Sequence, residues 1–302
     1  MTQRVTCEHI TKIYGNSPAK ALDDLDFSFS SHGIFALIGR NGSGKTTLVR
    51  ILATELEPTS GKASINGIDV VREARKLREK IAIVPQEARP IPWMTPMQTV
   101  RSYLLWRGFG YSEAKEKAFR TLQRLGLAEY CNDLNRKLSG GNRRKVMVAT
   151  VLASEAEVIF LDEPTTGLDP ISRRQFWNTL REVGKERFTF LTTHYLEEAE
   201  ELGDHIGILD RGRLIRIGTL NEVRESVSHN YSLRVFAAKE QIPNPKEGET
   251  VIGIDGSVTV FTTEEEAYRM SRELARLGLK FAITPISLDD IFVYLVGRRV
   301  NE

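Results

Sequence analysis

This chain has few cysteines and a net charge close to zero. Two cysteines occur in 302 residues, Cys7 and Cys131, far apart and outside any C-x-x-C pattern. Their spacing, with no clustered histidines, suggests neither a disulfide framework nor a zinc site, and it favours a reducing compartment. The 42 basic and 40 acidic residues leave a net charge of +2, which gives no general attraction to nucleic acid or anionic lipid. Any phosphate binding must therefore come from a local site.

Long apolar runs are also missing. No stretch approaches the roughly 20 apolar residues that a membrane-spanning helix needs, and the first 15 residues lack the continuous apolar core of a secretory signal. We therefore expect a soluble subunit that reaches a membrane only by docking onto another protein. With 41% hydrophobic and 27% charged residues, the composition is that of a globular chain with a sizeable core.

Strands and helices alternate along the first two-thirds of the sequence, which predicts an α/β layered domain. Between them, residues 99–138 carry apolar side chains at helical spacing, and this predicts a mostly helical insertion. The expected strands span residues 4–13, 33–38, 80–84, 157–161, 188–191 and 205–210, and the clearest helices span 45–54 and 143–153.

The last eighty or so residues predict a separate small α+β domain, a size ordinary for a domain. A loop rich in Pro, Asn and Gly covers residues 242–250. The expected strands span 231–238, 251–254, 257–261 and 280–283, and the expected helices span 264–277 and 288–296. We therefore place a first domain at residues 1–220, its helical part at about 88–150, and the second domain at 221–302.

The strongest local pattern is the loop from Gly39 to Thr46, GRNGSGKT, which matches G-x-x-x-x-G-K-[ST]. The apolar run GIFALI precedes it and TLVRILA, a predicted helix, follows it. Glycines let successive backbone N–H groups face one anion, and the helix N-terminus adds its dipole. The pattern predicts a P-loop in which Lys45 reaches the β- and γ-phosphates of a nucleotide and Thr46 places its hydroxyl on Mg²⁺.

Two further patterns accompany this loop. Asp162 and Glu163 end the apolar run VIFL; beside a P-loop, such a pair is typical of Mg²⁺ binding by Asp162 and orientation of the attacking water by Glu163. Ser139, Gly140 and Gly141 begin the helix that leads to this strand. They predict a helix cap and also a second anion site. Because one nucleotide does not need two such sites, the second suggests the nucleotide of a partner.

Together these patterns make the chain resemble the ATP-binding cassette (ABC) family, the nucleotide-binding subunits of ABC transporters, over about residues 1–220. Two positions depart from the common pattern, since Asn142 stands where glutamine is usual and Lys145 where arginine is frequent. The matching residues are Tyr14 at the adenine-stacking aromatic, Gly39 to Thr46 in the Walker A loop, Gln86 in the Q-loop, Leu138 to Asn142 in the signature, Asp162 and Glu163 in Walker B, Asp169 in the D-loop and His194 in the switch region.

The resemblance implies ATP as substrate, Mg²⁺ as cofactor and a specific set of site residues. Catalysis would fall to Glu163, His194 and Gln86, and the metal would be held by Thr46, Gln86 and Asp162. The residues implied in nucleotide binding are Tyr14, Gly39, Asn41, Gly42, Ser43, Gly44, Lys45, Thr46, Thr47, Ser139, Gly140, Gly141 and Asp169.

The residues by themselves leave a plainer interpretation open at four of these positions. Tyr14 would be an edge-strand aromatic, Gln86 a loop amide, Asp169 the cap of a helix that starts near Pro170, and His194 a histidine at a strand end. The presence of both Glu163 and His194 argues against a cassette that has lost hydrolysis.

The resemblance also implies partners. Two copies would meet head to tail, as a homodimer or as a heterodimer with a paralogue, closing on ATP and reopening after hydrolysis. A separately encoded transmembrane permease would hold the chain at the cytoplasmic face of the membrane, and no nucleic acid is expected. The tail segment Pro285 to Asp290, PISLDD, resembles exporter subunits of the drug, polysaccharide or lipid type.

Several alternatives stay open from sequence. Trp93, Met94 and Met97 either form an exposed groove for a partner helix or pack inside the helical part. The second domain is either a stabilising or dimer-contacting addition or a regulator of the cassette and of its assembly with the permease. The alternative function is a soluble ABC ATPase acting on nucleic acid or ribosomes. Such proteins usually carry two cassettes or a long coiled-coil insertion, whereas fewer than a hundred residues separate Lys45 from Ser139. The sequence does not identify the transported molecule.

Overall fold

The computed structural model describes residues 2–15, 19–227, 229–237, 242, 250–252 and 257–298. Most of the predicted loop at 242–250, the last residue of the predicted strand 231–238 and the end of the predicted strand 251–254 lie outside these residues. The chain divides into two compact units, Met1–Leu214 and Ile215–Glu302. The observed division therefore comes six residues before the domain boundary placed at 220.

A six-stranded sheet forms the centre of the first unit, in the order β10-β9-β3-β8-β7-β6, and the division between the units falls within its edge strand β10. The pairs β6–β7, β7–β8, β8–β3 and β3–β9 are parallel. All five residues of β3 are buried, as expected for a parallel strand covered on both faces. The strands are β3 (Ile34–Ile38), β6 (Ile81–Val84), β7 (Val158–Asp162), β8 (Phe188–Thr193), β9 (His205–Asp210) and β10 (Arg213–Gly218).

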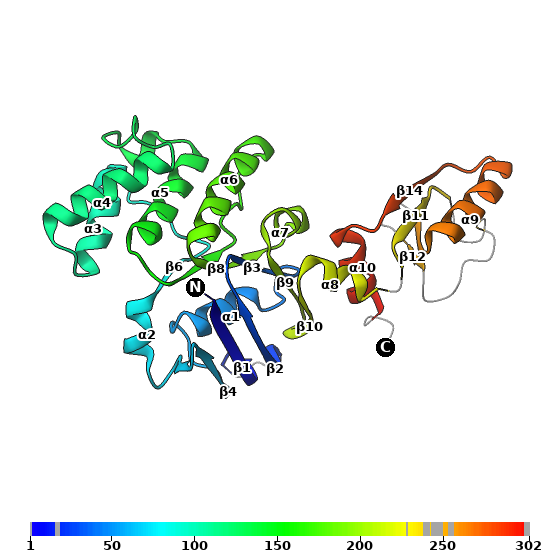
Figure 1. Cartoon of the computed structure of the whole chain (residues 1–302), viewed down its shortest axis with the longest axis horizontal. Coiled ribbons are helices and arrows are strands. Elements are labelled where there is room, and N and C mark those ends of the chain that lie inside the picture. Colours follow the sequence, from blue (N-terminus) through cyan, green and yellow to red (C-terminus); the bar gives the residue numbers. More distant parts are fainter. Residues whose placement is uncertain are drawn as a thin grey trace. The chain divides into compact units, whose positions relative to one another are not determined.

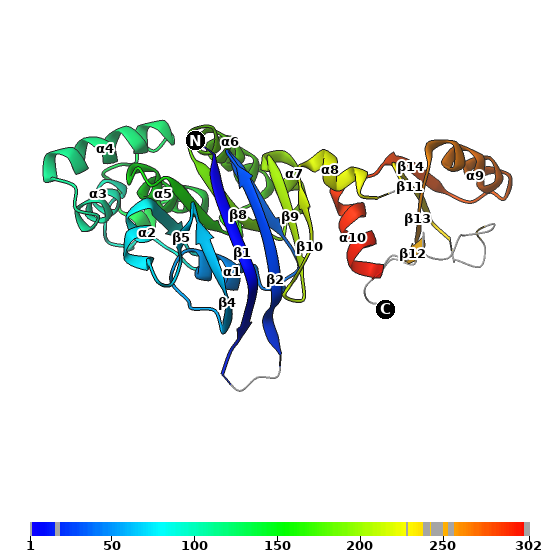
Figure 2. The ribbon, with the colours of Figure 1, turned by 60° about the horizontal axis from the view of Figure 1, so that its bottom comes forward.

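A second, antiparallel sheet belongs to the same unit, in the order β2-β1-β4-β5, with β1 and β2 forming the long ribbon of Figure 2. The sequence predicted β1 but missed β2, because β2 departs from strict alternation where Asp24 adopts a left-handed φ of 55° and the β1–β2 register shifts. The strands are β1 (Gln3–Ile13), β2 (Lys20–Ser31), β4 (Ser60–Ile65) and β5 (Ile68–Asp69).

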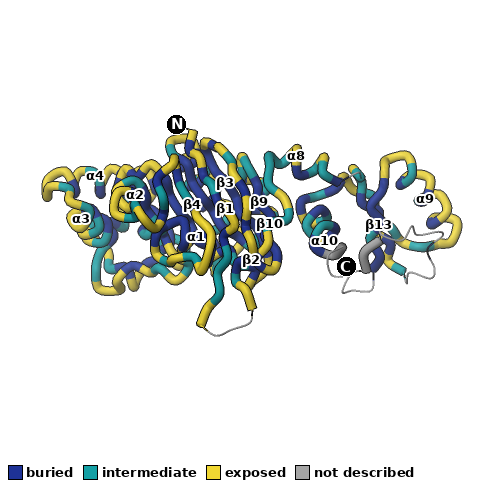
Figure 3. Tube along the Cα trace, turned by 90° about the horizontal axis from the view of Figure 1, so that it is seen from below, coloured by how far each residue is buried: buried dark blue, intermediate teal, exposed yellow. Residues whose placement is uncertain are grey.

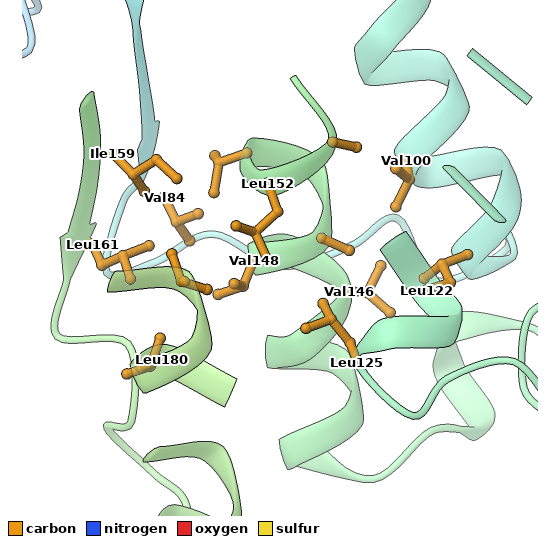
Figure 4. Packing of buried hydrophobic residues seen from close by; sticks show 14 of the residues in the cluster. Val84, Val100, Leu122, Leu125, Val146, Val148, Leu152, Ile159, Leu161 and Leu180 are labelled. Atoms are coloured by element: carbon orange, nitrogen blue, oxygen red, sulfur yellow. The ribbon is translucent and has the colours of Figure 1, made fainter. Parts of the chain in front are cut away.

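The predicted helical insertion is present and packs on the central sheet through one shared helix, α5. Figure 4 shows Val148 and Leu152 of α5 facing the sheet residues Val84 and Ile159, while Val146 of the same helix turns toward the other helices of the insertion. The insertion contains α3 (Pro96–Trp106), α4 (Tyr111–Arg124), the short helix η1 (Asn135–Lys137) and α5 (Gly140–Ala153); the unit also has α1 (Lys45–Leu52), α2 (Ala74–Lys80), α6 (Pro170–Glu186) and α7 (Leu196–Leu202) (Figure 1).

The second unit is a small α+β fold with an antiparallel sheet in the order β12-β13-β11-β14. Its helix α9 buries Ala267, Met270 and Leu274, which recur at helical spacing, while its other residues are exposed or half-buried (Figure 3). No helix within the described ranges is long and apolar enough to cross a membrane. The elements are α8 (Leu220–Glu225), β11 (Tyr231–Val235), β12 (Thr250–Ile252), β13 (Val258–Thr262), α9 (Glu264–Arg276), β14 (Phe281–Pro285) and α10 (Leu288–Arg298).

Candidate nucleotide-binding site

The loop between β3 and α1 has the backbone of an anion site. Gly44 precedes α1 with a φ of 107°, and an added Cβ would lie 2.4 Å from the carbonyl oxygen of Ala21, so only glycine fits there. No side chain caps α1, which leaves its first N–H groups available to a ligand. The Ser43 hydroxyl is buried without a hydrogen-bond partner among the described residues. Phosphate oxygens would satisfy all of these donors.

Lys45 curls back over the same loop. Its ammonium donates to the carbonyl oxygens of Gly39 at 2.8 Å and Arg40 at 3.2 Å, and lies 3.4 Å from Glu163 Oε1. Burial lowers the pKa of Lys45, and the charge of Glu163 opposes that shift. The ammonium is thus a buried positive charge at the mouth of the loop, where phosphate would be a better partner than two carbonyls.

Asp162 ends β7 as a buried carboxylate. Burial raises its pKa, while hydrogen bonds from the Thr192 and Thr46 hydroxyls lower it. A carboxylate and a threonine hydroxyl held together at a phosphate loop are oxygen ligands of the kind that Mg²⁺ takes. The residues present therefore fit a divalent cation, whose charge would relieve the burial of Asp162.

Glu163 is the centre of the site. Its Oε2 accepts from Gln86 Nε2 at 3.2 Å and from the Thr166 hydroxyl at 3.0 Å, and lies 2.9 Å from His194 Nδ1. Its backbone is left-handed, with a φ of 46°, a conformation that strains a residue with a side chain and that concentrates at functional sites. With the Lys45 ammonium near Oε1, four residues thus direct polar groups at one buried carboxylate.

These groups surround one cavity of about 670 Å³. It brings together most of the predicted P-loop with Gln86, Glu163 and His194 and adds Ala21 and Thr166, which the sequence analysis did not name. The lining residues are Ala21, Asn41, Gly42, Gly44, Lys45, Thr46, Thr47, Gln86, Glu163, Thr166 and His194.

Tyr14 lies beside this cavity but does not line it. Its hydroxyl is 3.3 Å from the Thr47 hydroxyl, and the Lys12 ammonium lies 5.6 Å from the centre of its ring. The ring is 43% exposed. Stacking of this ring on adenine stays a prediction.

The signature and D-loop residues lie apart from the cavity. Ser139 caps α5 by accepting from the Asn142 N–H at 3.2 Å, and no atom outside the local backbone lies within 4 Å of a Cβ built on Gly140. Asp169 caps α6 through the N–H groups of Ile171 and Ser172. The plainer interpretation of Asp169 as a helix cap is therefore correct, and it is compatible with a further role at an interface.

The apolar segment before α3 resolves into two kinds of residue. Trp93 is 75% exposed, while Met97 is half-buried and packs against the core cluster of the helical insertion. Met97 is therefore packed and Trp93 is exposed, and a groove for a partner helix at Trp93 stays a prediction.

Sequence analysis missed three residues that shape the site: Thr166, Thr192 and Arg144. Arg144 lies in the basic run NRRK, which resembles a solvated helix surface, yet it is buried. A sequence signal did exist, because Arg144 is four residues before Val148 and therefore shares its buried helix face.

Comparison with known proteins agrees with this geometry. A family model described as "ABC transporter" matches residues 22–166. The daunorubicin resistance ATP-binding protein DrrA3 of Streptomyces coeruleorubidus is 35% identical, over 99% of this chain and 98% of its own length. The daunorubicin/doxorubicin resistance ATP-binding protein DrrA of Streptomyces peucetius is 31% identical, over 100% of this chain and 94% of its own length.

Among solved structures, a dimeric post-hydrolysis state of the ATP-binding cassette MJ0796 bound to ADP and Pi superposes with a TM-score of 0.64 at 26% identity, covering 72% of this chain and 98% of that one. The predicted P-loop cassette fold and ATPase activity coupled to transport are thereby confirmed, and the alternative of a soluble ATPase acting on nucleic acid is not favoured. With a P-loop, a buried glutamate and full-length relatives of this kind, the chain belongs to the ABC transporter family, as an ATP-binding subunit.

Proposed function

We propose that this chain powers the export of a small amphipathic molecule by binding and hydrolysing ATP in the 670 Å³ cavity. One observation carries the catalytic part of the proposal. The buried carboxylate of Glu163 is contacted by Lys45, Gln86, Thr166 and His194 at the mouth of the P-loop.

The P-loop side of the cavity holds the phosphates. The start of α1 and Lys45 line this cavity, and the Ser43 hydroxyl of the same loop is buried without a hydrogen-bond partner among the described residues. When ATP binds, the Lys45 ammonium leaves two main-chain carbonyls and Glu163 and contacts phosphate oxygens instead. The Glu163 carboxylate is then free of Lys45 when the substrate is in place. Tyr14 offers its ring to the adenine.

Thr46, Asp162 and Gln86 are the residues that would hold Mg²⁺. When bound, the ion neutralises charge that builds on the phosphates during transfer. Glu163 orients the attacking water and accepts its proton. His194 contributes a second polar group at the same oxygen, and the Thr166 hydroxyl holds Oε2 in place.

A second copy of the chain completes each site. Ser139, Gly140 and Gly141 do not line the chain's own cavity, yet the Ser139 hydroxyl and the start of α5 form a polar cap of the kind that binds anions. The similar cassette MJ0796 is dimeric with ADP and Pi. We therefore assign this turn to the nucleotide held by the partner copy, with ATP favouring the closed dimer.

A membrane permease completes the transporter at the cytoplasmic face. Relatives that match nearly the full length of this chain are named for daunorubicin and doxorubicin resistance, which supports export of a planar, amphipathic drug-like molecule. Trp93, 75% exposed beside α3, is the apolar anchor that we assign to the permease.

Two measurements test this proposal. The purified chain should release phosphate from ATP with Mg²⁺ and stop when EDTA removes the ion, and Asp162→Asn should abolish the Mg²⁺-dependent activity. Affinity purification from a native membrane extract should recover a polytopic membrane protein with this chain. Recovery of nucleic acid with strongly salt-dependent binding, and of no membrane protein, would contradict the transporter assignment.

A further inference from the structure

Arg144 is a buried cation near the start of α5, only 5% exposed. Its guanidinium has five N–H groups, and main-chain carbonyl oxygens accept from all of its nitrogen atoms. Nε donates to Pro164 at 2.7 Å, Nη1 to Gln86 and Ala88 at 3.1 and 3.2 Å, and Nη2 to Asp162 and Glu163 at 3.4 and 2.9 Å.

These five carbonyls belong to two separate loops of the site. Gln86 and Ala88 follow β6, while Asp162 is the last residue of β7 and Glu163 and Pro164 follow it. The side chains of Gln86 and Glu163, one from each loop, meet at Glu163 Oε2. Arg144 therefore joins the backbones of two loops whose side chains converge on the same carboxylate oxygen.

The same guanidinium supports the strained part of the chain. Glu163 has a φ of 46°, and Arg144 binds its carbonyl and the carbonyls on both sides of it. On the other side, the Glu163 N–H donates to the Thr192 hydroxyl and carbonyl at 3.0 and 3.1 Å. A left-handed residue with a side chain persists only where its surroundings hold it. The hydrogen bonds of Arg144 and of Thr192 hold Glu163 in this conformation.

Arg144 keeps its positive charge although it is buried. Burial and the neighbouring Arg89 lower its pKa to about 10, and Asp162, Glu87 and Glu163 oppose that shift, so the guanidinium remains protonated at neutral pH. Arg89 also donates to the carbonyls of Gln86 and Ala88, from the exposed side. Within the described ranges Arg89 has no hydrogen bond to Glu163, so of these two arginines Arg144 is the one that spans both loops.

We propose that Arg144 is a positioning residue for ATP hydrolysis, fixing the backbones of Glu163 and Gln86 so that their side chains meet at the attacking water. This inference rests on the proposed catalytic role of Glu163. A lysine at this position would keep the charge but lose the planar fork that reaches both loops.

The test uses Arg144→Lys and Arg144→Gln in the full chain, with Arg107→Lys as the matched control. Arg107 also donates to three main-chain carbonyls, those of Arg78, Glu79 and Ile81, and none of these residues lines the nucleotide cavity. The measurements are kcat at saturating ATP with Mg²⁺, the Kd of a fluorescent ATP analogue, and the melting temperature.

We expect both Arg144 variants to lower kcat roughly 10- to 100-fold while the Kd changes less than about threefold, and Arg107→Lys to keep wild-type kcat. Arg144 variants with wild-type kcat would overturn the inference. So would a loss of fold in both, or losses of kcat and affinity that follow the melting temperature, since Arg144 would then be only structural. If Glu163→Gln itself kept wild-type kcat, the proposed function would fail instead.

Discussion

Replacing Glu163 by glutamine tests the chemistry of the site most cleanly, because the amide keeps the size of the side chain and removes its basicity. The carboxylate is contacted by Gln86, Thr166 and His194 on Oε2 and lies 3.4 Å from Lys45 on Oε1. Loss of a general base typically costs about 10²- to 10⁴-fold in rate. We therefore expect kcat to fall at least about 100-fold with ATP affinity unchanged or tighter.

The nucleotide-free protein should also respond. Lys45 and Glu163 are 4% and 6% exposed, and breaking a buried pair by removing one charge costs about 3–5 kcal/mol. The amide oxygen still accepts from Lys45, which also donates to two carbonyls, so we expect a loss near the lower figure. For a unit of this size that is a fall of roughly 6–12 °C in melting temperature, and ATP should restore most of it because phosphate replaces Glu163 beside Lys45.

Phosphate release, binding of a fluorescent ATP analogue and thermal melting with and without ATP measure these effects. Glu186→Gln is the control, since Glu186 forms an exposed pair with Arg124 at 2.7 Å and should leave all three unchanged. A Glu163→Gln protein with wild-type kcat would refute the assignment of the base. Equal melting shifts with and without ATP would refute the exchange of partners by Lys45.

Three other changes have defined outcomes. Glu198 is fully buried, accepts from the Trp177 indole at 3.0 Å and has a pKa raised by burial. Glu198→Gln should keep the free energy of unfolding, while Glu198→Ala should lower it by about 1–3 kcal/mol. Because the pKa of Glu198 is raised in the folded protein, its contribution to the free energy of unfolding falls as pH rises above the ordinary value of 4.5. The melting temperature of Glu198→Gln should therefore rise relative to wild type at higher pH, and a pH-independent difference would contradict this. Tyr14→Ala should weaken ATP binding roughly 2- to 10-fold in a titration, with Tyr14→Phe close to wild type; equal weakening by both would remove the stacking role. Trp93→Ala should lower transport by the assembled transporter without changing basal ATPase, whereas Trp106→Ala, at an equally exposed tryptophan, should change neither; normal transport with Trp93→Ala would exclude the docking role.

Local patterns were enough to predict the P-loop and its surroundings. The spacing of Gly39, Gly44 and Lys45 between an apolar strand and a helix is a backbone requirement, and it is visible in one stretch of sequence. The same holds for Asp162 at the end of a fully apolar strand. Where a side chain acts on its own segment, sequence is sufficient.

Contacts between distant segments were not predictable in the same way. Arg144 donates to main-chain carbonyls 18 to 58 residues away in sequence. Within the run NRRK, only the helical register indicates which basic side chain is buried. Thr166 was overlooked because Thr165 adjoins it and the sequence does not show which of the two hydroxyls the turn after Glu163 directs at Oε2. Strand β2 was missed because left-handed Asp24 interrupts its alternation.

The mass of the Glu163→Gln protein in solution shows whether two copies of this chain enclose ATP between the P-loop of one and the Ser139 turn of the other. Light scattering should give two chains with ATP and Mg²⁺ and one chain with ADP, and the ATP-bound species should hold two nucleotides. Replacing Ser139 by arginine should prevent the dimer without preventing ATP binding. A single chain saturated with one ATP under all of these conditions would contradict the account.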